Sequence, residues 1–412
     1  MRAAAAAQSR VAAIDLDERL VRSARAREAL AAAADAIVDA AVSEARQPRR
    51  FARREMQSAL GLLDALPDLA QAIRPVVVPA VSGSTLLEWA PYGVVLGWHA
   101  ANSPVWVPTL VASSALVAGN AVVCRPSSRA RRTTMLVLEA LRRAWPEDAL
   151  VVADLPGPEA EPLVWDPGVG LVVAHASSAT CKRHLAGLGR AYAEGAPLRP
   201  YIPEGSGNDA MIVLPGADLD VAAAAAALGG FANAGQLCMS AKRMIVSRAV
   251  WGDFAPRLVA AVGALAEGPA RERARAALAE ALERGGRILV GEGERGPHFT
   301  PTVVVLPRDA EDVALWREES FAPLRGLMVV DDAADALALA NDSRYALGAA
   351  VFGPGEEVVA GLRAARVLVD EGPLYQDAHL VVGGVGDSGF AGARPKVEQM
   401  VWARRVHRAE GS

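Results

Sequence analysis

Apolar and charged residues alternate at helical spacing through the first part of the chain. Apolar side chains recur three and four positions apart, as at Leu20, Ala24 and Leu30, with Arg and Glu between them. This spacing places the apolar residues on one face of a helix. The pattern therefore predicts helices over residues 8–74, a section that Pro75 ends because proline does not continue a helix.

Short apolar runs then alternate with helical patterns. Two extended runs flank a turn at residues 82–84, and the segments VVLGW, AVVCR, ALVVADL and GLVVAH are typical of buried strands. The helices predicted between or after them span residues 107–117, 129–144 and 179–193. This alternation predicts a parallel sheet with helices on both faces.

A second block of the same kind begins near Pro203. Its predicted strands are AMIVL, RMIV, RILVGE, TVVVL, GLMVV, AAVFG and RVLVD. Its predicted helices are Leu219–Ala234, Val250–Arg284 (mostly helical), Ala333–Asn341 and Val358–Ala365. The segment MVWARRVHR predicts an edge strand near the end of the chain. The expected fold class is therefore α/β, with two parallel-sheet domains and a cleft between them.

The charge balance argues against strongly basic or membrane-bound classes of protein. Among 412 residues, 43 are Lys or Arg and 47 are Asp or Glu, so the net charge of −4 favours neither nucleic acid nor a membrane surface as a partner. The chain has no uncharged run of about 18 strongly apolar residues, so no membrane span is expected. The start lacks the sustained apolar segment of a signal peptide. We expect a cytoplasmic enzyme.

The cysteines and histidines limit the possible disulfide and metal chemistry. The odd and sparse set of Cys124, Cys181 and Cys238 argues against a disulfide framework and favours a reducing compartment. The six histidines lack metal-ligand spacing, so no metal is expected. A lone cysteine is usually a buried structural residue. That interpretation suits Cys124, which lies inside an apolar strand, and Cys181.

The segment FANAGQLCMSAKRMIV gives Cys238 a different context. Gly235, Gln236, Cys238 and Arg243 resemble the signature of the aldehyde dehydrogenase superfamily, which places a glycine-glutamine step before the catalytic cysteine and an arginine after it. Further segments resemble the family in the same order along residues 80–400: PYGVVLGWHAANSP, ALVAGNAVVCRPS, GADLDVA, FTPTVV, EESFAP and GGVGDSGF. The chain is identified as a divergent, somewhat shortened and NAD(P)-dependent member.

The resemblance implies the domain organisation. Residues 1–203 would hold the N-terminal helices and the dinucleotide-binding domain, with an oligomerisation hairpin near residues 76–90. Residues 204–381 would form the catalytic domain. Residues 382–412 would form a tail that returns to the cofactor domain and adds an oligomerisation strand. A homodimer or homotetramer is expected.

The resemblance also implies how an aldehyde is oxidised to a carboxylic acid. Cys238, as a thiolate, would add to the carbonyl carbon and pass through a thiohemiacetal to a thioester. The Asn102 side-chain amide and the Cys238 backbone N–H would stabilise the oxyanion. Glu204, 34 positions before the cysteine, would be the general base for thioester hydrolysis. The competing interpretations are a turn residue for Asn102 and a solvated loop carboxylate for Glu204.

The expected cofactor is NADP or NAD, with NADP favoured. No GxGxxG follows a strand, and the family lacks that motif too. The resemblance assigns the adenosine end to Arg125 and Ser128, the pyrophosphate to a helix N-terminus at Ser177, and the nicotinamide end to Glu319 and Phe321. Ser128 stands where a carboxylate would repel a 2′-phosphate, and arginines follow it. The competing interpretations are a solvated helical turn for the Ser128 loop, a helix-end carboxylate for Glu319 and core packing for Phe321.

Departures from the family pattern keep two other functions open. Asn208 replaces the usual lysine after Glu204, and Asp370, Val381 and Val382 alter the expected border of the aldehyde pocket. One alternative is a CoA-acylating aldehyde dehydrogenase or acyl-CoA reductase, in which CoA rather than water takes the acyl group. Glu204 argues against it, because acylating members generally lack that base. The other alternative is a non-catalytic dinucleotide-binding paralogue, against which the retention of the whole candidate set argues.

Overall fold

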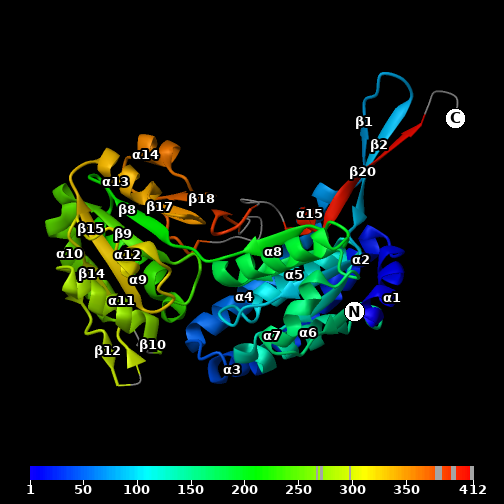
Figure 1. Cartoon of the computed structure of the whole chain (residues 1–412), viewed down its shortest axis with the longest axis horizontal. Coiled ribbons are helices and arrows are strands. Elements are labelled where there is room, and N and C mark those ends of the chain that lie inside the picture. Colours follow the sequence, from blue (N-terminus) through cyan, green and yellow to red (C-terminus); the bar gives the residue numbers. More distant parts are fainter. Residues whose placement is uncertain (266–267, 270–271, 297, 376–382, 391–395, 409–412) are drawn as a thin grey trace. The chain divides into compact units, whose positions relative to one another are not determined.

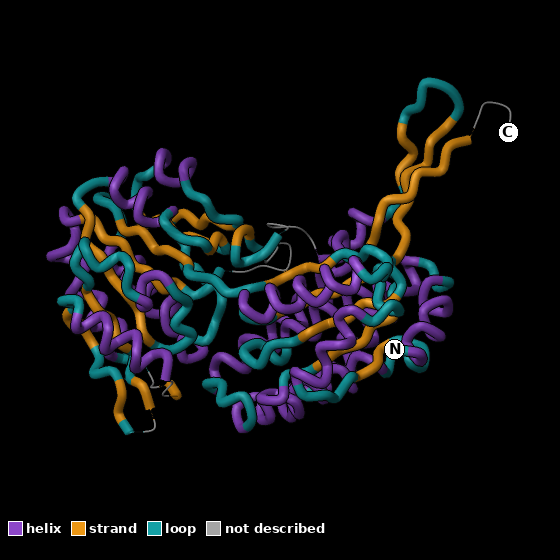
Figure 2. The backbone as a smooth tube through the Cα atoms, in the orientation of Figure 1, coloured by secondary structure: helices purple, strands orange, loops and turns teal. Residues whose placement is uncertain are grey.

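The computed structural model describes residues 1–265, 268–269, 272–296, 298–375, 383–390 and 396–408. These residues form two compact units. Unit 1 comprises the described residues of 1–204 and 394–412, and unit 2 comprises those of 205–376 and 382–393. Each unit is built around its own sheet with helices packed against it (Figures 1 and 2).

Unit 1 begins with the helices α1 to α4, which are Arg2–Ala12, Leu16–Ala32, Ala34–Ser43 and Arg49–Leu69. The Asp15 side chain caps α2 by accepting a hydrogen bond from the backbone N–H of Glu18. Each of these helices buries its apolar face: Leu30 of α2, Ile37 of α3 and Leu66 of α4 are fully buried. The predicted helical section is confirmed, although its first helix begins at Arg2 rather than near residue 8.

A parallel sheet with strand order β5–β4–β3–β6–β7 forms the centre of unit 1. The strands are β3 Val94–Trp98, β4 Ala121–Arg125, β5 Leu150–Val152, β6 Leu171–His175 and β7 Tyr201–Glu204. The helices are α5 Trp106–Val117, α6 Arg131–Arg142, α7 Gly157–Ala160 and α8 Ser178–Ala193, with 3-10 turns at Ala70–Ile73, Ser128–Ala130 and Glu161–Trp165. Every residue of β3 and β4 is buried, as expected for a parallel sheet covered on both faces.

Strand β7 was not among the strands predicted from the sequence. Its residues Tyr-Ile-Pro-Glu contain a proline and precede a glycine-rich segment, so they lack the pattern of a buried strand. The strand lies at the edge of the sheet, beside β6, where a missing backbone N–H is tolerated. Glu204 therefore ends a strand, pairs in register with His175 and is only 8% exposed. The interpretation of Glu204 as a solvated loop carboxylate is wrong.

The sheet of unit 2 has the strand order β11–β14–β15–β9–β8–β17–β18 and is parallel except for β11. Its strands are β8 Asp209–Val213, β9 Ala241–Ser247, β11 Arg287–Val290, β14 Thr302–Val305, β15 Leu324–Val330, β17 Gly348–Phe352 and β18 Arg366–Val369. Shorter strands are β10 Gly268–Pro269, β12 Glu294–Arg295, β13 His298–Phe299, β16 Tyr345–Ala346 and β19 Val385–Gly386. The helices are α9 Leu219–Phe231, α10 Arg248–Gly263, α11 Glu272–Glu283, α12 Ala314–Arg317, α13 Ala333–Asn341 and α14 Glu356–Gly361. The predicted α/β class with two parallel sheets is confirmed.

Three helices predicted in unit 2 differ from those observed. The helical stretch predicted over residues 250–284 consists of α10 and α11, because Gly268–Pro269 between them pairs with β13 as a short strand. The helix predicted over residues 219–234 ends at Phe231, since left-handed residues follow. The helix predicted over residues 358–365 is α14, which begins two residues earlier and ends at Gly361.

Strands β1 Val76–Val78, β2 Ser84–Pro91 and β20 Val401–Arg408 form a separate antiparallel sheet that projects from the rest of unit 1 (Figure 1). β2 and β20 run side by side from the Ser84–Arg408 pair to the Pro91–Val401 pair. The predicted hairpin and edge strand are confirmed. Val77 and Val81 of the hairpin and Trp402 of β20 are exposed. Among the described residues, no helix has the length and apolar character needed to cross a bilayer.

Candidate functional site

Cys238 follows a tight turn that joins α9 to β9. Asn233, Ala234 and Gly235 all have left-handed backbones, with φ of 50°, 54° and 72°. This conformation is strained for residues other than glycine. At Gly235 a Cβ atom would lie 2.2 Å from the carbonyl oxygen of Ala322, so a side chain does not fit there. The glycine of the Gly-Gln-Leu-Cys segment is therefore a steric requirement of the turn that presents the cysteine.

Arg325 of β15 fixes the start of this turn. Its buried guanidinium donates hydrogen bonds to the carbonyl oxygens of Gly230 (2.7 Å), Ala322 (2.7 Å) and Gly235 (3.2 Å). A further bond of 3.0 Å reaches Oγ of Ser240. Carbonyl groups buried in a turn need donors, and a guanidinium supplies several from one side chain. Arg325 thus joins β15 to both sides of the cysteine turn.

Lys242 is buried against the same turn. Its ammonium nitrogen donates to the backbone carbonyl oxygens of Leu237 (2.8 Å), Cys238 (2.6 Å) and Ser240 (3.3 Å). The same nitrogen lies 3.5 Å from Oε1 of Glu319, and the lysine side chain is only 1% exposed. A charge buried this deeply requires polar partners, and the cysteine turn provides them.

Glu319 connects the cysteine turn to a glycine of the preceding segment. Its Oε1, beside Lys242, also accepts the backbone N–H of Gly207 at 3.2 Å. Gly207 itself packs against the turn, because a Cβ atom there would lie 2.3 Å from the carbonyl oxygen of Cys238. Phe321, the other residue predicted for the nicotinamide end, is half-buried and has a left-handed φ of 48°. Unit 2 therefore brings the cysteine turn and Glu319 into one hydrogen-bonded group.

The three cysteines differ in exposure. Cys124 and Cys181 are buried, whereas Cys238 is partly exposed. Burial raises the pKa of the Cys124 thiol far above its usual value and raises that of Cys181 to about 11. Both thiols are therefore protonated and unreactive at neutral pH. The interpretation of Cys124 and Cys181 as buried residues is confirmed.

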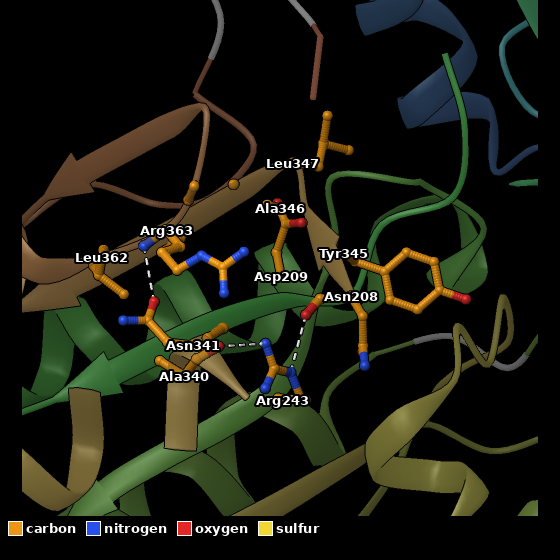
Figure 3. Close-up of a pocket in the computed structure, with 14 residues that line it drawn as sticks. Asn208, Asp209, Arg243, Ala340, Asn341, Tyr345, Ala346, Leu347, Leu362 and Arg363 are labelled. Carbon is orange, nitrogen blue, oxygen red and sulfur yellow. Dashed lines mark hydrogen bonds between the residues drawn. The ribbon is translucent and has the colours of Figure 1, made fainter. Parts of the chain in front are cut away.

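A cavity in unit 2 is lined by residues of β8, β9 and the segments around α13 and β17 (Figure 3). Its volume of about 10 Å³ accommodates about one water molecule, so it does not admit an aldehyde or a dinucleotide. Arg243, the arginine of the signature, borders this cavity and donates to the carbonyl oxygens of Asn208 (3.0 Å), Leu339 (3.0 Å) and Ala340 (2.9 Å). Arg243 thus joins β9 to neighbouring segments and has a structural function.

Glu204 forms a buried ion pair with Lys396 of α15 (Lys396–Gln399) in unit 1. Burial raises the pKa of the Glu204 carboxyl, and the positive charge of Lys396 opposes that rise. Both ring nitrogens of neighbouring His175 are buried without a hydrogen-bond partner in the described part of the chain. Burial, with the charges of Lys396 and His99, lowers the pKa of His175 well below its usual value. Glu204 is thus a carboxyl group of raised proton affinity held by a cation.

The loop that carries Asn102 is held by a buried carboxylate of α4. Glu55 Oε1 accepts hydrogen bonds from Oγ of Ser103 (2.7 Å) and from the backbone N–H of Trp106 (2.9 Å), the first residue of α5. Gln47 donates to Oε2 of Glu55 (2.8 Å) and to the carbonyl oxygen of Asn102 (3.1 Å). The backbone at Asn102 is therefore fixed from the helical layer.

Arg125 is the last residue of β4, and its side chain packs against neighbouring residues of unit 1. Its guanidinium carbon lies 4.4 Å from the ring centroid of Trp98, and its Nε donates to the carbonyl oxygen of Leu155 at 3.2 Å. Burial lowers the pKa of this guanidinium. Stacking on an aromatic face is a contact that arginine makes better than lysine. Arg125 is thereby held at the carboxyl edge of the sheet, where ligands of parallel α/β folds bind.

The basic side chains that follow β4 are exposed, but they differ in whether an acidic side chain already binds them. Ser128 and Arg129 lie in a 3-10 turn and are exposed. Arg131 is also exposed, but it forms a two-pronged pair with the carboxylate of Asp154. Arg131 therefore already has an anionic partner. Arg129 is therefore the better placed of the two for a ligand phosphate.

Ser177 is the N-cap residue of α8. Its Oγ accepts the backbone N–H of Thr180 at 3.2 Å and lies 3.0 Å from Oγ1 of the same residue. Ser177 is exposed, and α8 has 16 residues. Backbone N–H groups at the start of a helix, together with the helix dipole, attract anions. The helix begins just after β6, so this end of α8 lies at the carboxyl edge of the sheet.

The predicted site residues are divided between the units. Unit 1 contains Asn102, Arg125, Ser128, Ser177 and Glu204, and unit 2 contains Cys238, Glu319 and Phe321. The sequence analysis missed Lys242, Lys396 and Glu55. A signal existed for Lys242, because a lysine within a buried apolar strand must be paired. No local signal marks Lys396 or Glu55, whose partners are distant in sequence.

The remaining sequence expectations concern metals and the aldehyde pocket. Within the described ranges, no three His, Cys, Asp or Glu side chains are grouped as metal ligands. Asp370 follows β18 with a left-handed φ of 50°, and its Oδ1 accepts the backbone N–H of Gly353 at 2.8 Å. Asp370 therefore stabilises a turn. Val381 and Val382 lie outside the described residues.

Comparison with known proteins gives extended matches. A model of the aldehyde dehydrogenase family matches residues 1–403. A vanillin dehydrogenase of Pseudomonas sp. (strain HR199 / DSM 7063) is 31% identical over 374 residues, which cover 84% of this chain and 76% of that protein. An NAD(P)+ succinate semialdehyde dehydrogenase of Escherichia coli (strain K12) is 28% identical over 388 residues, or 88% of this chain and 82% of that protein.

Solved structures match over nearly the whole chain. The NADP-dependent glyceraldehyde-3-phosphate dehydrogenase of Bacillus halodurans C-125, complexed with NADP, has a TM-score of 0.90 at 25% identity and covers 99% of this chain and 90% of its own. A salicylaldehyde dehydrogenase of Pseudomonas putida G7, complexed with salicylaldehyde, has a TM-score of 0.92 at 20% identity and covers 100% and 89%. The second likeness shows the fold alone.

Proposed function

The chain belongs to the aldehyde dehydrogenase family, and we propose that Cys238, Asn102 and Glu204 are its catalytic residues. The protein oxidises an aldehyde to a carboxylic acid with NAD or NADP. The observation that carries the assignment is the partial exposure of Cys238, in a turn held by buried cations, whereas Cys124 and Cys181 are buried.

Cys238 is the nucleophile of the proposed mechanism. Its thiolate forms a bond to the aldehyde carbon, and the electron pair of the C=O bond moves to the oxygen, which gives a thiohemiacetal oxyanion. The side-chain amide of Asn102 and the backbone N–H of Cys238 donate to that oxyanion. When bound, the dinucleotide supplies the acceptor for the hydride that the thiohemiacetal releases as it becomes a thioester.

Glu204 is the general base of the second half of the reaction. It takes a proton from water as the water oxygen attacks the thioester carbon, and the carbon–sulfur bond then breaks to release the carboxylic acid and the Cys238 thiolate. The contact with Lys396 orients the carboxylate and favours its ionised form. Water is the acyl acceptor in this proposal, because a base of this kind is needed to activate water but not a thiol as acidic as that of CoA.

Residues of unit 1 fit a dinucleotide. The first turn of α8, capped by Ser177, offers backbone N–H groups to the pyrophosphate. Arg125 lies at the end of β4, near the expected adenosine ribose, and the buried unpartnered nitrogens of His175 supply hydrogen-bonding groups at the same edge of the sheet. Ser128 and Arg129, both exposed, suit a 2′-phosphate, so we propose a preference for NADP.

In unit 2, Glu319 and Phe321 are proposed to contact the nicotinamide end. Lys242 and Gly207 both contact Oε1 of Glu319. An ionised carboxylate accepts hydrogen bonds at both oxygens, so Oε2 is the atom proposed for the ribose hydroxyl. In this scheme unit 1 binds most of the dinucleotide, and unit 2 supplies the nucleophile.

The projecting sheet of β1, β2 and β20 is proposed to join subunits. Val77, Val81 and Trp402 expose apolar surface on it, and such patches on a protein surface mark interaction sites. A homodimer or homotetramer follows from this proposal. Light scattering on the purified protein would measure the mass, and Val77→Asp with Val81→Asp should shift it toward the monomer.

The assignment of Cys238 is tested by Cys238→Ala. The variant should lose aldehyde oxidation while it still binds NADP, which fluorescence titration on the same preparation measures. Cys124→Ala and Cys181→Ala are matched controls and should remain active. Retention of more than roughly a hundredth of wild-type turnover by Cys238→Ala would refute the nucleophile, since covalent catalysis supplies more than that.

A further inference from the structure

We propose that Lys242 is a positioning residue of the oxidation: its buried ammonium anchors the Cys238 turn to Glu319, so that the thiolate forms beside a fixed positive charge. The inference rests on the proposed assignment of Cys238 as the nucleophile. It goes beyond that assignment because it names the group that positions the Cys238 turn and favours ionisation of the thiol.

The contacts of Lys242 are made to the nucleophile and its immediate neighbours. Its nitrogen reaches the carbonyl oxygen of Cys238 at 2.6 Å, that of Leu237 at 2.8 Å and that of Ser240 at 3.3 Å. Arg325 binds the backbone of the same turn at Gly230 and Gly235, before the cysteine, and the Ser240 side chain after it. Both cations contact Ser240, but of the two it is Lys242 that has a hydrogen bond to the peptide group of the nucleophile.

The geometry requires that the lysine be charged. Three carbonyl oxygens and one carboxylate oxygen surround its nitrogen, and all of them are acceptors. An ammonium group has three donors and no acceptor, whereas a neutral amine would direct its lone pair at one of these oxygens. Burial lowers the pKa of Lys242, and the charges of Glu319 and Asp209 raise it. The two carboxylates thus favour the ammonium form and oppose the effect of burial.

The charge of Lys242 lies beside the peptide group of the nucleophile, with Nζ 2.6 Å from the carbonyl oxygen of Cys238. The charged groups that interact with Lys242 are Glu319, Asp209, Arg325 and the Cys238 thiolate. Arg366 is a second cation that interacts with the thiolate. A cation beside a cysteine stabilises the thiolate relative to the thiol, and the thiolate is the nucleophile. Removal of the Lys242 charge should therefore leave the cysteine protonated at higher pH.

Glu319 extends the arrangement toward the cofactor. The contacts run from the N–H of Gly207 to Glu319 Oε1, from there to Lys242, and from Lys242 to the carbonyl of Cys238. Because Glu319 is the proposed partner of the nicotinamide ribose, the same lysine holds a cofactor contact and the nucleophile in register. Loss of Lys242 should therefore raise KM for the dinucleotide and also lower the rate at which the Cys238 thiol reacts.

The test is the pH dependence of alkylation of Cys238 by iodoacetamide, with the modified residue located by peptide mass. Lys242→Met removes the charge and the donors, and Lys242→Gln removes the charge but keeps an amide donor. Both should raise the midpoint of the alkylation profile by about one pH unit or more, so that the rate below the midpoint falls about tenfold. Arg257→Met removes a surface cation that pairs with Asp220 and should leave the profile unchanged.

Two results would overturn the proposal. A wild-type profile in both Lys242 variants, or a shift in Lys242→Met that Lys242→Gln fully reverses, would assign the lysine a purely structural role. Thermal unfolding of each variant shows whether the fold is retained, and Lys242→Gln keeps the test available if Lys242→Met does not fold. Alkylation requires no turnover, so a wild-type protein without aldehyde oxidation would refute the proposed function and leave this test intact.

Discussion

Nζ of Lys396 donates a hydrogen bond to Oε1 of Glu204, a residue 192 positions earlier in the chain, and both side chains are more than nine-tenths buried. Such a pair is sensitive to the loss of one partner, because the other then remains as an uncompensated charge. The proposed general base therefore depends on a residue of the C-terminal segment. Strand β20, which belongs to the projecting sheet, starts two residues after α15.

Lys396→Met should move the acid limb of the kcat–pH profile to higher pH. Glu204 must be ionised to accept a proton, its pKa is already raised by burial, and Lys396 is the charge that opposes the rise. His175 does not produce this limb, because its pKa lies well below its usual value, nor does Cys181, with a pKa of about 11. Lys396→Arg should restore the limb, and Arg27→Met is a surface control. An acid limb that stays in place in Lys396→Met would exclude the coupling.

Glu204→Gln should separate acylation from deacylation. The variant keeps the shape of the side chain but accepts no proton, so one equivalent of reduced cofactor should appear as a burst. Steady turnover should then fall by roughly 10²–10⁴, and the acyl-enzyme should appear as added mass on Cys238. Glu147→Gln, at an exposed position, is the control. Unchanged steady turnover, or wild-type product formed only when CoA is present, would favour the CoA-acylating alternative.

Asn102→Ala should lower kcat by roughly 10²–10³, the effect of losing one oxyanion donor. The backbone of the loop should persist, because Gln47 binds the carbonyl oxygen of Asn102 and not its side chain. Steady-state kinetics at saturating cofactor give kcat and KM for the aldehyde. A change confined to KM would make Asn102 a binding residue.

The ratio of kcat/KM for NADP to that for NAD should exceed one. Ser128→Glu should reverse the preference, since a carboxylate at this exposed position repels a 2′-phosphate. Arg129→Gln should weaken NADP selectively, whereas Arg131→Gln should have a smaller effect because Asp154 already binds that arginine. A strong NAD preference that Ser128→Glu does not alter would show that another segment selects the cofactor.

Asp209→Asn should remove a pH dependence of stability. Burial raises the pKa of Asp209 in the folded protein from 3.8 to about 6, against which Lys242 and Arg366 act. A folded pKa above the unfolded one means that the folded state binds the proton of Asp209 more tightly. Protonation of Asp209 therefore adds to the free energy of unfolding below about pH 4, and this stabilisation is lost as pH rises through 6. The shift corresponds to ~3 kcal/mol. Urea unfolding between pH 4 and 7 measures it, with Asp253→Asn as an exposed control, and parallel curves for Asp209→Asn and wild type would contradict the prediction.

The sequence by itself predicted most elements and the local context of the nucleophile. Side chains on one face of a helix or strand recur at a fixed spacing in the sequence. The spacing of apolar residues therefore predicted the helices, both parallel sheets and the projecting hairpin. The Gly-Gln-Leu-Cys segment was identified by its resemblance to the family signature, and the structure gives the reason for its glycine, which is the left-handed turn at Gly235. Strand β7 was not predicted, because Pro203 and the glycines that follow it interrupt the apolar pattern by which a strand is recognised.

The partners of the buried charges were decided only by the tertiary structure. Glu204 was visible as a candidate, but its burial and its pairing with Lys396 depend on a contact across 192 positions. The sequence around Glu55 and Lys242 does not indicate which groups form hydrogen bonds with them. A charged residue in a sequence shows only that a partner is needed if the residue is buried, since the cost of burial is independent of which residue supplies the opposite charge. The packing of the chain determines which residue that is.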